Sequence, residues 1–318
     1  MNALEGVRKI QQNYDINAIY ARRVFSLVDK NNLLLDAAKI ISEKPKPFIK
    51  WVGGKRQLLS QFRKLNLYPP EKFNIDTGNY FEPFVGGGAV FFDLLPEKAH
   101  LSDLNGELVT TYNVIKNDVE NLIKSLKKHK VTKEYFLKIR EQNPENLSDV
   151  SIAARFIYLN RTCFNGMYRV NSKGKFNVPY GKHNNPLVCD ETNLRKVSKA
   201  LQKVQIKHQD YKAILKHVKK GDFIYFDPPY YPVSKTSTFT AYTKESFLDK
   251  EQLELRDTFL ELQKRGCFVM LSNSDSGFIN KIYSGYKGIS INKVEAGRAI
   301  NSKGSGRGKI TEVLITNY

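Results

Sequence analysis

The fold is decided by the stretch Asp222-Phe223-Ile224-Tyr225-Phe226-Asp227-Pro228-Pro229-Tyr230-Tyr231. Its aromatic and β-branched run follows Gly221, a pattern typical of a buried central strand in a parallel sheet. Two consecutive prolines then end the strand, because proline has no N–H for the hydrogen-bond ladder and fixes φ at about −65°. We therefore predict a strand up to Phe226 and a stiff loop from Asp227 at the carboxyl edge of the sheet.

Ligands bind at this edge of an open α/β sheet, and the predicted loop carries groups that suit one. It offers the carboxylate of Asp227, the carbonyl of Pro228 and the ring of Tyr230. Such a set fits a flat heterocycle with an exocyclic amine, because the oxygens accept the two N–H protons while the ring stacks on the face. The alternative is an ordinary strand-to-loop exit with a surface tyrosine.

The Asp-Pro-Pro-Tyr sequence resembles the catalytic motif of the N6-adenine DNA methyltransferases. The resemblance implies that Asp227 and the Pro228 carbonyl hold the target amine, while Tyr230 stacks on a flipped-out adenine. It also implies that Asp227 lies against the cofactor, S-adenosyl-L-methionine, which leaves as S-adenosyl-L-homocysteine.

Size and charge set the frame for this interpretation. A chain of 318 residues, 41% of them hydrophobic, can bury one large core or two modest ones. Its net charge is +19, with 51 lysines and arginines against 32 acids. A polyanionic partner is the simplest explanation, although charge alone also fits a merely basic soluble protein.

Cysteine and histidine usage predicts no metal site. Cys163, Cys189 and Cys267 have spacings that suit neither zinc nor a disulfide framework, and the five histidines include no ligand pair on a helix face. The sequence has no signal peptide at its start and no apolar run long enough to span a bilayer. We expect a cytoplasmic protein without a metal or a membrane partner, associated with the nucleoid through DNA.

Residues 1–45 are predicted to form a separate, mostly helical extension. It ends at Lys44-Pro45-Lys46-Pro47, where alternate prolines favour an extended linker, so the main domain begins near Phe48. A packing arm is the preferred role for the extension. A DNA or partner contact through Arg22, Arg23 and Lys30 is the alternative.

The next block is Lys50-Trp51-Val52-Gly53-Gly54-Lys55. Its glycine pair lets the backbone approach a ligand just before a helix N-terminus, which favours anionic groups, although a plain loop-helix junction has the same form. The block resembles the family motif that closes over the cofactor. That implies cofactor contacts for Trp51 and Lys55, with Lys55 at the cofactor carboxylate, while Lys50 matches a position that reaches the DNA in Dam-type enzymes.

A strand, a glycine turn and a helix are predicted over Tyr80 to Phe91. Pyrophosphate binding needs G-x-G-x-x-G, but Phe91 replaces the last glycine, so a nucleoside without phosphates fits better. Fifteen residues after Gly88, a second strand delivers Asp103, an acid that suits a ribose diol. Both features resemble the S-adenosylmethionine site. That implies a lining by Phe84, Gly86 and Gly88, with Asp103 on the ribose.

Residues 112–196 change in character to amphipathic helices with many lysines, followed by a predicted hairpin from Phe164 to Gly181. Asn-Gly stands at its base and Ser-Lys-Gly at its tip. Cations, aromatic residues and amides are mixed along it, as reading of a DNA groove requires. A solvated basic hairpin is the alternative.

This hairpin closely resembles the recognition hairpin of Dam-type enzymes that methylate GATC. The resemblance implies that Arg169 reads a guanine and that Met167 or a neighbour fills the base stack. The remaining residues implied to lie near DNA are Asn165, Asn171, Lys173, Pro179, Lys182 and His183. Lys182 and His183 stand where related enzymes often carry Arg and Tyr.

The sheet resumes after the insertion with a strand over Val204 to Lys207, followed by Asp210. Asp210 either meets the cofactor's adenine, as is common in this fold family, or caps a helix over 211–218. The Ser/Thr-rich loop 233–244 is expected either to order against a phosphate backbone or to close over the pocket. The basic loop 298–309 suits phosphate groups, and a plain disordered linker is the alternative. A helix over 253–263 and strands over 267–271 and 311–316 complete the predicted elements.

The order of these blocks is similar to the class alpha, Dam-type arrangement. The fold implied is α/β, a doubly wound, mostly parallel Rossmann-like sheet. Its catalytic domain comprises 46–111 and 197–318, and a mainly helical DNA-recognition domain at 112–196 is inserted after the second strand.

The function implied is site-specific adenine methylation of double-stranded DNA within GATC. A protective role in a restriction-modification system is expected, with the endonuclease a functional rather than physical partner and the enzyme a monomer. A solitary Dam-like methylase or an RNA adenine methyltransferase is the alternative. A protein amine methyltransferase, a nicotinamide oxidoreductase and a non-catalytic DNA-binding protein compete more weakly.

Overall fold

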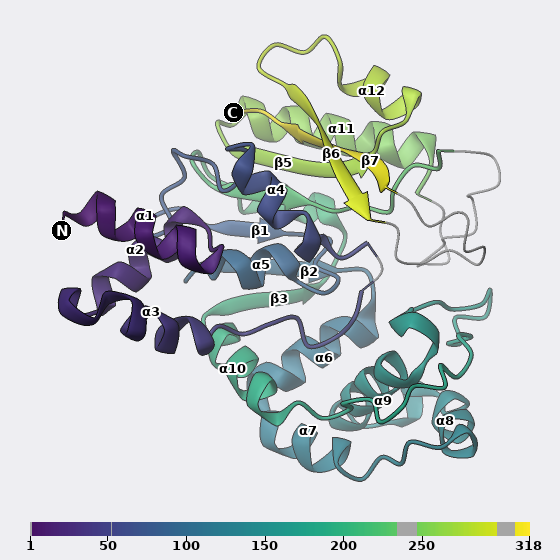
Figure 1. Cartoon of the computed structure of the whole chain (residues 1–318). Coiled ribbons are helices and arrows are strands. Elements are labelled where there is room, and N and C mark those ends of the chain that lie inside the picture. The colour runs from purple at the N-terminus through teal and green to yellow at the C-terminus, as the bar shows by residue number, and fades with distance from the viewer. Residues whose placement is uncertain (1, 52, 234–246, 298–308) are drawn as a thin grey trace.

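The computed structural model describes residues 2–51, 53–233, 247–297 and 309–318 (Figure 1). The two loops predicted to contact phosphates, 233–244 and 298–309, lie outside these ranges apart from their end residues Val233 and Lys309. None of the described helices is both long and apolar enough to cross a membrane.

The described strands form one seven-stranded sheet with the order β3-β2-β1-β4-β5-β7-β6. Only β7 runs antiparallel to its neighbours, which confirms the prediction of a mostly parallel sheet. The strands are β1 (Tyr80–Glu82), β2 (Ala99–Asp103), β3 (Val204–His208), β4 (Phe223–Phe226), β5 (Phe268–Ser274), β6 (Ser290–Gly297) and β7 (Lys309–Thr316). The predicted strand β4 lies at the centre with all its residues buried.

Side chains alternate between the two faces of the sheet and build two cores. Tyr80, Phe223 and Tyr225 belong to one core, while Phe81, Ile224 and Phe226 belong to the other. The first core is covered by α4 (Leu59–Lys64), α5 (Ala89–Leu94), α6 (Gly106–Asn117) and α10 (Glu191–Leu201). The second is covered by the 3₁₀ helix η5 (Tyr211–Lys216), α11 (Asp249–Lys264) and α12 (Gly277–Tyr283). The sheet is therefore doubly wound, as predicted.

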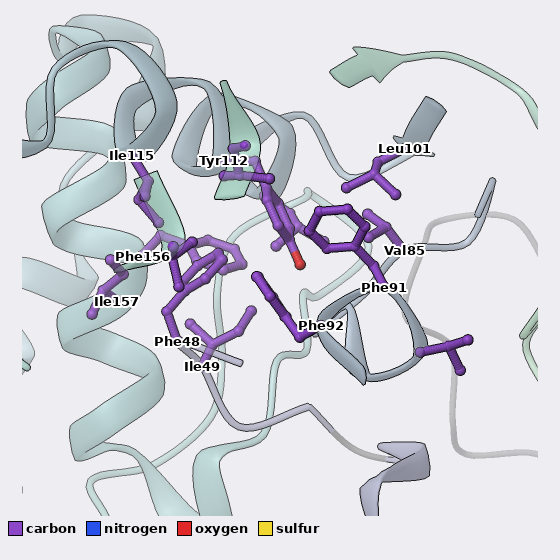
Figure 2. Close-up of a cluster of buried hydrophobic side chains, with 14 of the residues drawn as sticks. Phe48, Ile49, Val85, Phe91, Phe92, Leu101, Tyr112, Ile115, Phe156 and Ile157 are labelled. Atoms are coloured by element: carbon purple, nitrogen blue, oxygen red, sulfur yellow. The ribbon is translucent and has the colours of Figure 1, made fainter. Parts of the chain in front are cut away.

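The first core continues into the helical insertion between β2 and β3. Figure 2 shows Phe91 and Phe92 next to Tyr112, with Phe48 and Phe156 beside them. The insertion contains α7 (Val119–Leu126), α8 (Lys133–Arg140) and α9 (Asp149–Thr162), and short 3₁₀ turns lie at Pro144–Asn146 and Phe164–Gly166. Because α9 packs on α6, the insertion and the sheet share one core.

The predicted hairpin is present but only loosely paired. Two isolated antiparallel bridges join Cys163 to Tyr180 and Val170 to Phe176. The side chain of Asn171 closes the tip by accepting hydrogen bonds from the amides of Lys173 and Lys175, both 3.0 Å long. Most side chains between the bridges are exposed, so little apolar burial supports a longer ladder.

The N-terminal extension is helical, as predicted, with α1 (Ala3–Tyr14), α2 (Ala18–Leu27) and α3 (Leu33–Ser42) around a small core of its own. Short 3₁₀ turns follow at Lys30–Asn32 and, beyond the linker, at Lys55–Gln57. In Figure 1 these three helices lie on the far side of the sheet from the arrowhead of β6. The role of the extension, as a packing arm or as a DNA or partner contact through Arg22, Arg23 and Lys30, stays a prediction.

A partly buried charge cluster joins the extension to the sheet domain through Asp93, near the end of α5. Its carboxylate lies 3.2 Å from Lys44 Nζ and 3.1 Å from Arg63 Nη1, and it accepts a hydrogen bond from Asn17 Nδ2 at 3.2 Å. Arg63 also pairs with Asp15 at 3.1 Å. Asp93 thus neutralises cations from the linker and α4 at one point.

Replacing Asp93 with alanine should destabilise the protein strongly. Lys44 and Arg63, whose side chains are each 14% exposed, would lose the carboxylate that compensates their burial. We expect the free energy of unfolding, measured by urea denaturation, to fall by on the order of 3 kcal/mol. Glu97→Ala is the control, because this acid is 55% exposed where it meets Arg23, and a loss there as large as that for Asp93→Ala would contradict the assignment.

Candidate active site

The candidate site lies at the carboxyl ends of β1 and β4, where the strand order reverses. Such a switch point is the usual ligand-binding position of an open α/β sheet. Two segments distant in sequence meet there, the glycine-rich loop after β1 and the Asp-Pro-Pro-Tyr loop after β4.

Buried amides hold the Asp-Pro-Pro-Tyr loop in place. Gln252 on α11 donates to the Pro229 carbonyl at 3.0 Å, and Asn273 on β5 accepts from the Tyr231 amide at 3.0 Å. These two amide side chains also bond to each other at 3.0 Å, and both are fully buried. None of the residues that the structure describes donates to the Pro228 carbonyl. The contact of this carbonyl with a target amine stays a prediction.

Lys55 reaches into this loop from the Trp-Val-Gly-Gly-Lys segment. Its ammonium lies 2.9 Å from Asp227 Oδ1 and 4.7 Å from the centre of the Tyr230 ring, and it donates to the Gly53 carbonyl. The lysine is buried, with a side chain only 2% exposed. The sequence predicts Lys55 near a cofactor carboxylate, but here its partner is the carboxylate of Asp227.

Burial and charge oppose each other at Asp227. Burial raises the pKa of this carboxyl to about 6, the nearby Lys55 ammonium lowers it, and Glu312 adds a smaller increase. Asp227 therefore changes its charge close to neutral pH, which is typical of carboxylates at functional sites.

Glu312 is a site residue that sequence analysis does not identify. Its Oε2 accepts a hydrogen bond from the Tyr230 hydroxyl at 2.7 Å. Glu312 comes from β7 and is 8% exposed. The available signal is an acid within the run Ile310-Thr311-Glu312-Val313-Leu314-Ile315, but the sequence does not distinguish a buried acid in a strand from an exposed one.

The glycine-rich loop brings together the residues predicted to hold the cofactor. Asp103 accepts hydrogen bonds from the amides of Gly86 at 3.1 Å and Asn105 at 2.9 Å. Gly86 has a φ of +45°, and a Cβ there would lie 2.6 Å from the Trp51 indole nitrogen. Trp51 in turn stacks on Tyr168 with ring centres 5.9 Å apart. Loop, indole and hairpin base therefore form one continuous wall.

Phe84 and Asp210 lie at the edge of this region. Phe84 stacks on Tyr211 with ring centres 5.3 Å apart. The Asp210 carboxylate accepts from the Lys212 amide at 2.8 Å and caps η5. The helix-cap interpretation of Asp210 is thus the one the structure shows, and a cofactor contact stays a prediction.

Most of the residues predicted to meet DNA are exposed around the hairpin. The exposed ones are Lys50, Asn165, Arg169, Asn171, Lys173, Pro179 and Lys182, whereas Met167 and His183 are half-buried. Met167 packs against the core, while Phe164, which sequence analysis names only as the start of the hairpin, is 49% exposed. Arg169 Nε donates to Asn177 at 2.8 Å, and the His183 ring lies 2.9 Å from the Cys163 carbonyl.

Lys50 is tied directly to the base of the hairpin. The Asn160 side chain bonds both the amide and the carbonyl of Lys50, at 2.9 and 2.8 Å, and donates to the Gly166 carbonyl at 3.0 Å. A Cβ on Gly166 would lie 2.6 Å from the Lys50 side chain. The structure therefore brings Lys50 next to Asn165, as two members of one surface.

Comparison with known proteins agrees with this geometry. The sequence profile of the family described as D12 class N6 adenine-specific DNA methyltransferase matches residues 51–300. The chain is a member of this D12 class. It is 46% identical over 281 residues to the Type II methyltransferase M1.LlaDCHI of Lactococcus lactis subsp. cremoris, over 86% of this chain and 95% of that protein.

Two further relatives belong to distant organisms. The Type II methyltransferase M.MjaIII of Methanocaldococcus jannaschii is 46% identical over 291 residues, which span 86% of this chain and 99% of the relative. The DNA adenine methylase of Escherichia coli strain K12 is 30% identical over 277 residues, which span 86% and 95%. Membership of this class removes the oxidoreductase alternative and makes the chain an adenine-specific DNA methyltransferase.

The D12 class uses S-adenosylmethionine, and the residues of this site fit a nucleoside cofactor. Gly88 has a φ of +67°, and a Cβ there would lie 2.7 Å from the Tyr112 hydroxyl, so only glycine allows this close approach. Phe91 blocks the close helix approach that a pyrophosphate needs. Among the described residues, no group of three or more His, Cys, Asp or Glu side chains is placed to hold a metal ion.

A second buried acid, Glu82, lies beneath the glycine loop of this D12-class site. It is 2% exposed and accepts from the Tyr80 hydroxyl at 2.9 Å and from the Phe91 amide at 3.1 Å. Burial raises the pKa of Glu82 to about 8, so the side chain is largely neutral at neutral pH. Sequence analysis misses this role because Glu82 reads only as the end of a strand.

Replacing Glu82 with glutamine should flatten the pH dependence of stability. As pH rises from 4.5 to about 8, the unfolded chain loses this proton while the folded protein keeps it, so wild-type stability falls across that window. Relative to wild type, Glu82→Gln should therefore gain on the order of 2–4 kcal/mol between the two ends of the window. Urea denaturation at both ends measures it. Parallel curves for the two proteins would contradict a buried proton, and the exposed Glu97→Gln should show no such gain.

Proposed function

We propose that this D12-class enzyme transfers the methyl group of S-adenosylmethionine to N6 of a flipped-out adenine within GATC in duplex DNA. The observation that carries the proposal is the rigid Asp-Pro-Pro-Tyr loop, with a paired carboxylate and an available carbonyl at the switch point of the sheet. It acts as a monomer that protects host DNA in a restriction-modification system. The 46% identity to proteins named Type II methyltransferases, against 30% to a DNA adenine methylase, supports this role over a solitary one.

The chemistry requires activation of a weak nucleophile. The lone pair of adenine's amine is delocalised into the ring, and acceptance of both its protons by Asp227 and the Pro228 carbonyl favours a pyramidal nitrogen. S-adenosylmethionine, when bound, supplies an electrophilic methyl group on a positively charged sulfur. The N6–C bond forms as the C–S electron pair returns to sulfur, and the extra proton on nitrogen passes to Asp227 and then to water. Positioning and electrostatics supply most of the catalysis.

The target atom lies inside the duplex, so the base must leave the stack. Flipping costs about a few kcal/mol. Stacking on the Tyr230 ring, on the order of 1–3 kcal/mol, offsets part of that cost. Tyr230 suits this task because its ring is already fixed between the Lys55 ammonium and Glu312.

The hairpin supplies recognition in this proposal. Arg169 is exposed and oriented by Asn177, which suits a bidentate contact to guanine. The apolar group that fills the base stack is Met167 or its exposed neighbour Phe164. Lys50, held at the base of the same hairpin, reaches the DNA backbone.

The experiment that tests this function is transfer of labelled methyl from S-adenosylmethionine to short duplexes. We expect incorporation at adenine in GATC duplexes, about 5- to 150-fold less in GATT duplexes, where one wrong base pair costs about 1–3 kcal/mol, and still less in shuffled duplexes. Asp227→Ala should abolish transfer while leaving DNA binding largely intact. Transfer to other sequences alone would discard GATC, and preferred methylation of a stem-loop RNA would replace the substrate class.

The pH dependence of transfer should follow Asp227. Only the ionised carboxylate accepts from the amine, so kcat/KM, which reports the free enzyme, should fall as pH drops through about 6. Lys55→Met removes the cation that lowers this pKa, and the acid limb should move to higher pH. Weaker cofactor binding would lower kcat/KM at every pH without moving the acid limb. A change in the position of the limb therefore reports the pKa of Asp227. An unmoved limb in the variant would show that another group titrates.

A further inference from the structure

The Tyr230 hydroxyl is anchored by a residue from the last strand of the chain. It donates to Glu312 Oε2 at 2.7 Å, a normal length for an O–H···O hydrogen bond. Glu312 pairs across the sheet with Ser274, the last residue of β5, and so lies at the ligand edge. The catalytic loop and β7 are therefore joined by one strong contact.

A carboxylate is an unfavourable choice at this place unless it has a task. Glu312 is 8% exposed and is followed by the fully buried Val313 and Leu314. Within the described part of the chain, no lysine or arginine lies within ion-pair distance of it, and its hydrogen-bond partner is the Tyr230 hydroxyl. An isolated buried acid is costly, so its contact with the tyrosine is the feature that explains it.

We propose that Glu312 is a positioning residue for methyl transfer, which fixes the Tyr230 ring in the orientation that the target base needs. The inference rests on the proposed function, in which that ring is the stacking platform. A hydrogen bond at the far end of a tyrosine holds the hydroxyl in place and so prevents rotation about the Cα–Cβ bond, which would carry the ring away from the site. With the ring fixed, an adenine that stacks on it has few orientations, and its amine lies next to Asp227 and the Pro228 carbonyl.

Two further observations support this role. The pKa of Tyr230 lies well above its ordinary value because the hydroxyl is buried and because Asp227 and Glu312 are near, so the group stays protonated and keeps donating. The Lys55 ammonium lies 4.7 Å from the centre of the same ring and 2.9 Å from Asp227. A ring that rotates would therefore disturb the cation that sets the charge of the catalytic carboxylate.

The test compares single-turnover methyl transfer at saturating cofactor and DNA in Glu312→Ala, Glu312→Gln, Tyr230→Phe and the Tyr230→Phe/Glu312→Ala double variant. Tyr225→Phe is the matched control, since it also removes a buried hydroxyl bonded to a neighbouring strand, to Ser272 at 2.9 Å. Thermal stability and the dissociation constant of S-adenosylmethionine are measured for each protein.

We expect Glu312→Ala and Tyr230→Phe each to slow the single-turnover rate by about tenfold, the effect of a modest misplacement of the reacting groups. Glutamine keeps the acceptor, so Glu312→Gln should recover the rate to within about threefold of wild type. The double variant should be no slower than the slower single variant. Cofactor affinity should stay within about twofold, and Tyr225→Phe should lower stability without slowing transfer.

Three results would overturn the proposal: a full rate in Glu312→Ala, equal losses in the alanine and glutamine variants, or losses that multiply in the double variant. If Glu312→Ala does not fold, Tyr230→Phe decides in its place, because a full rate there removes the need for an anchor. Tyr230→Ala separates this inference from the proposed function. A slow Tyr230→Ala beside a normal Glu312→Ala would sink only the anchor, whereas a normal Tyr230→Ala would sink the stacking platform itself.

Discussion

The ion pair between Lys55 and Asp227 is the interaction on which the rest of the site depends. It joins the segment that precedes the first strand to the loop that leaves the central strand, at a place where the Lys55 side chain is buried and the Asp227 side chain is 23% exposed. Without the cation, burial would favour the protonated carboxyl. The Lys55 ammonium therefore favours an ionised Asp227 at a site where burial favours the neutral acid. The loops around the pair hold the two groups at the distance that this compensation requires.

Three features of the surrounding structure hold this ion pair in place. Alternate residues of β4 belong to two different cores, so the strand that ends in Asp227 is fixed from both faces of the sheet. The helical insertion shares the first core rather than hanging from a linker. The N-terminal extension adds a third support at Asp93, at the end of the helix that follows the glycine loop. A rigid frame of this kind suits catalysis that relies on preorganised groups more than on strong acids or bases.

Much of the fold and part of the site could be predicted from sequence because the signals are local. The two prolines, the glycine loop and Asp103 each define their own surroundings within a few residues, and the structure brings them together at the predicted edge. Lys55 was expected at the cofactor, but its partner depends on which loop folds over it. The roles of Glu82 and Glu312 could not be predicted, because their burial depends on the tertiary packing around them. The strand β6 was missed because its sequence has no clear strand pattern. The predicted hairpin is present but weakly paired, because most of its side chains are exposed and little apolar burial supports the pairing.

The direction of β7 has a consequence for how the site is assembled. Because this strand runs opposite to its neighbours, its early residues lie at the ligand edge, where Glu312 accepts a hydrogen bond from the Tyr230 hydroxyl. A parallel strand in the same place would have presented that position at the opposite edge. The site thus joins segments as distant in sequence as Lys55 and Glu312, and folding must bring both to the Asp-Pro-Pro-Tyr loop before the site is complete.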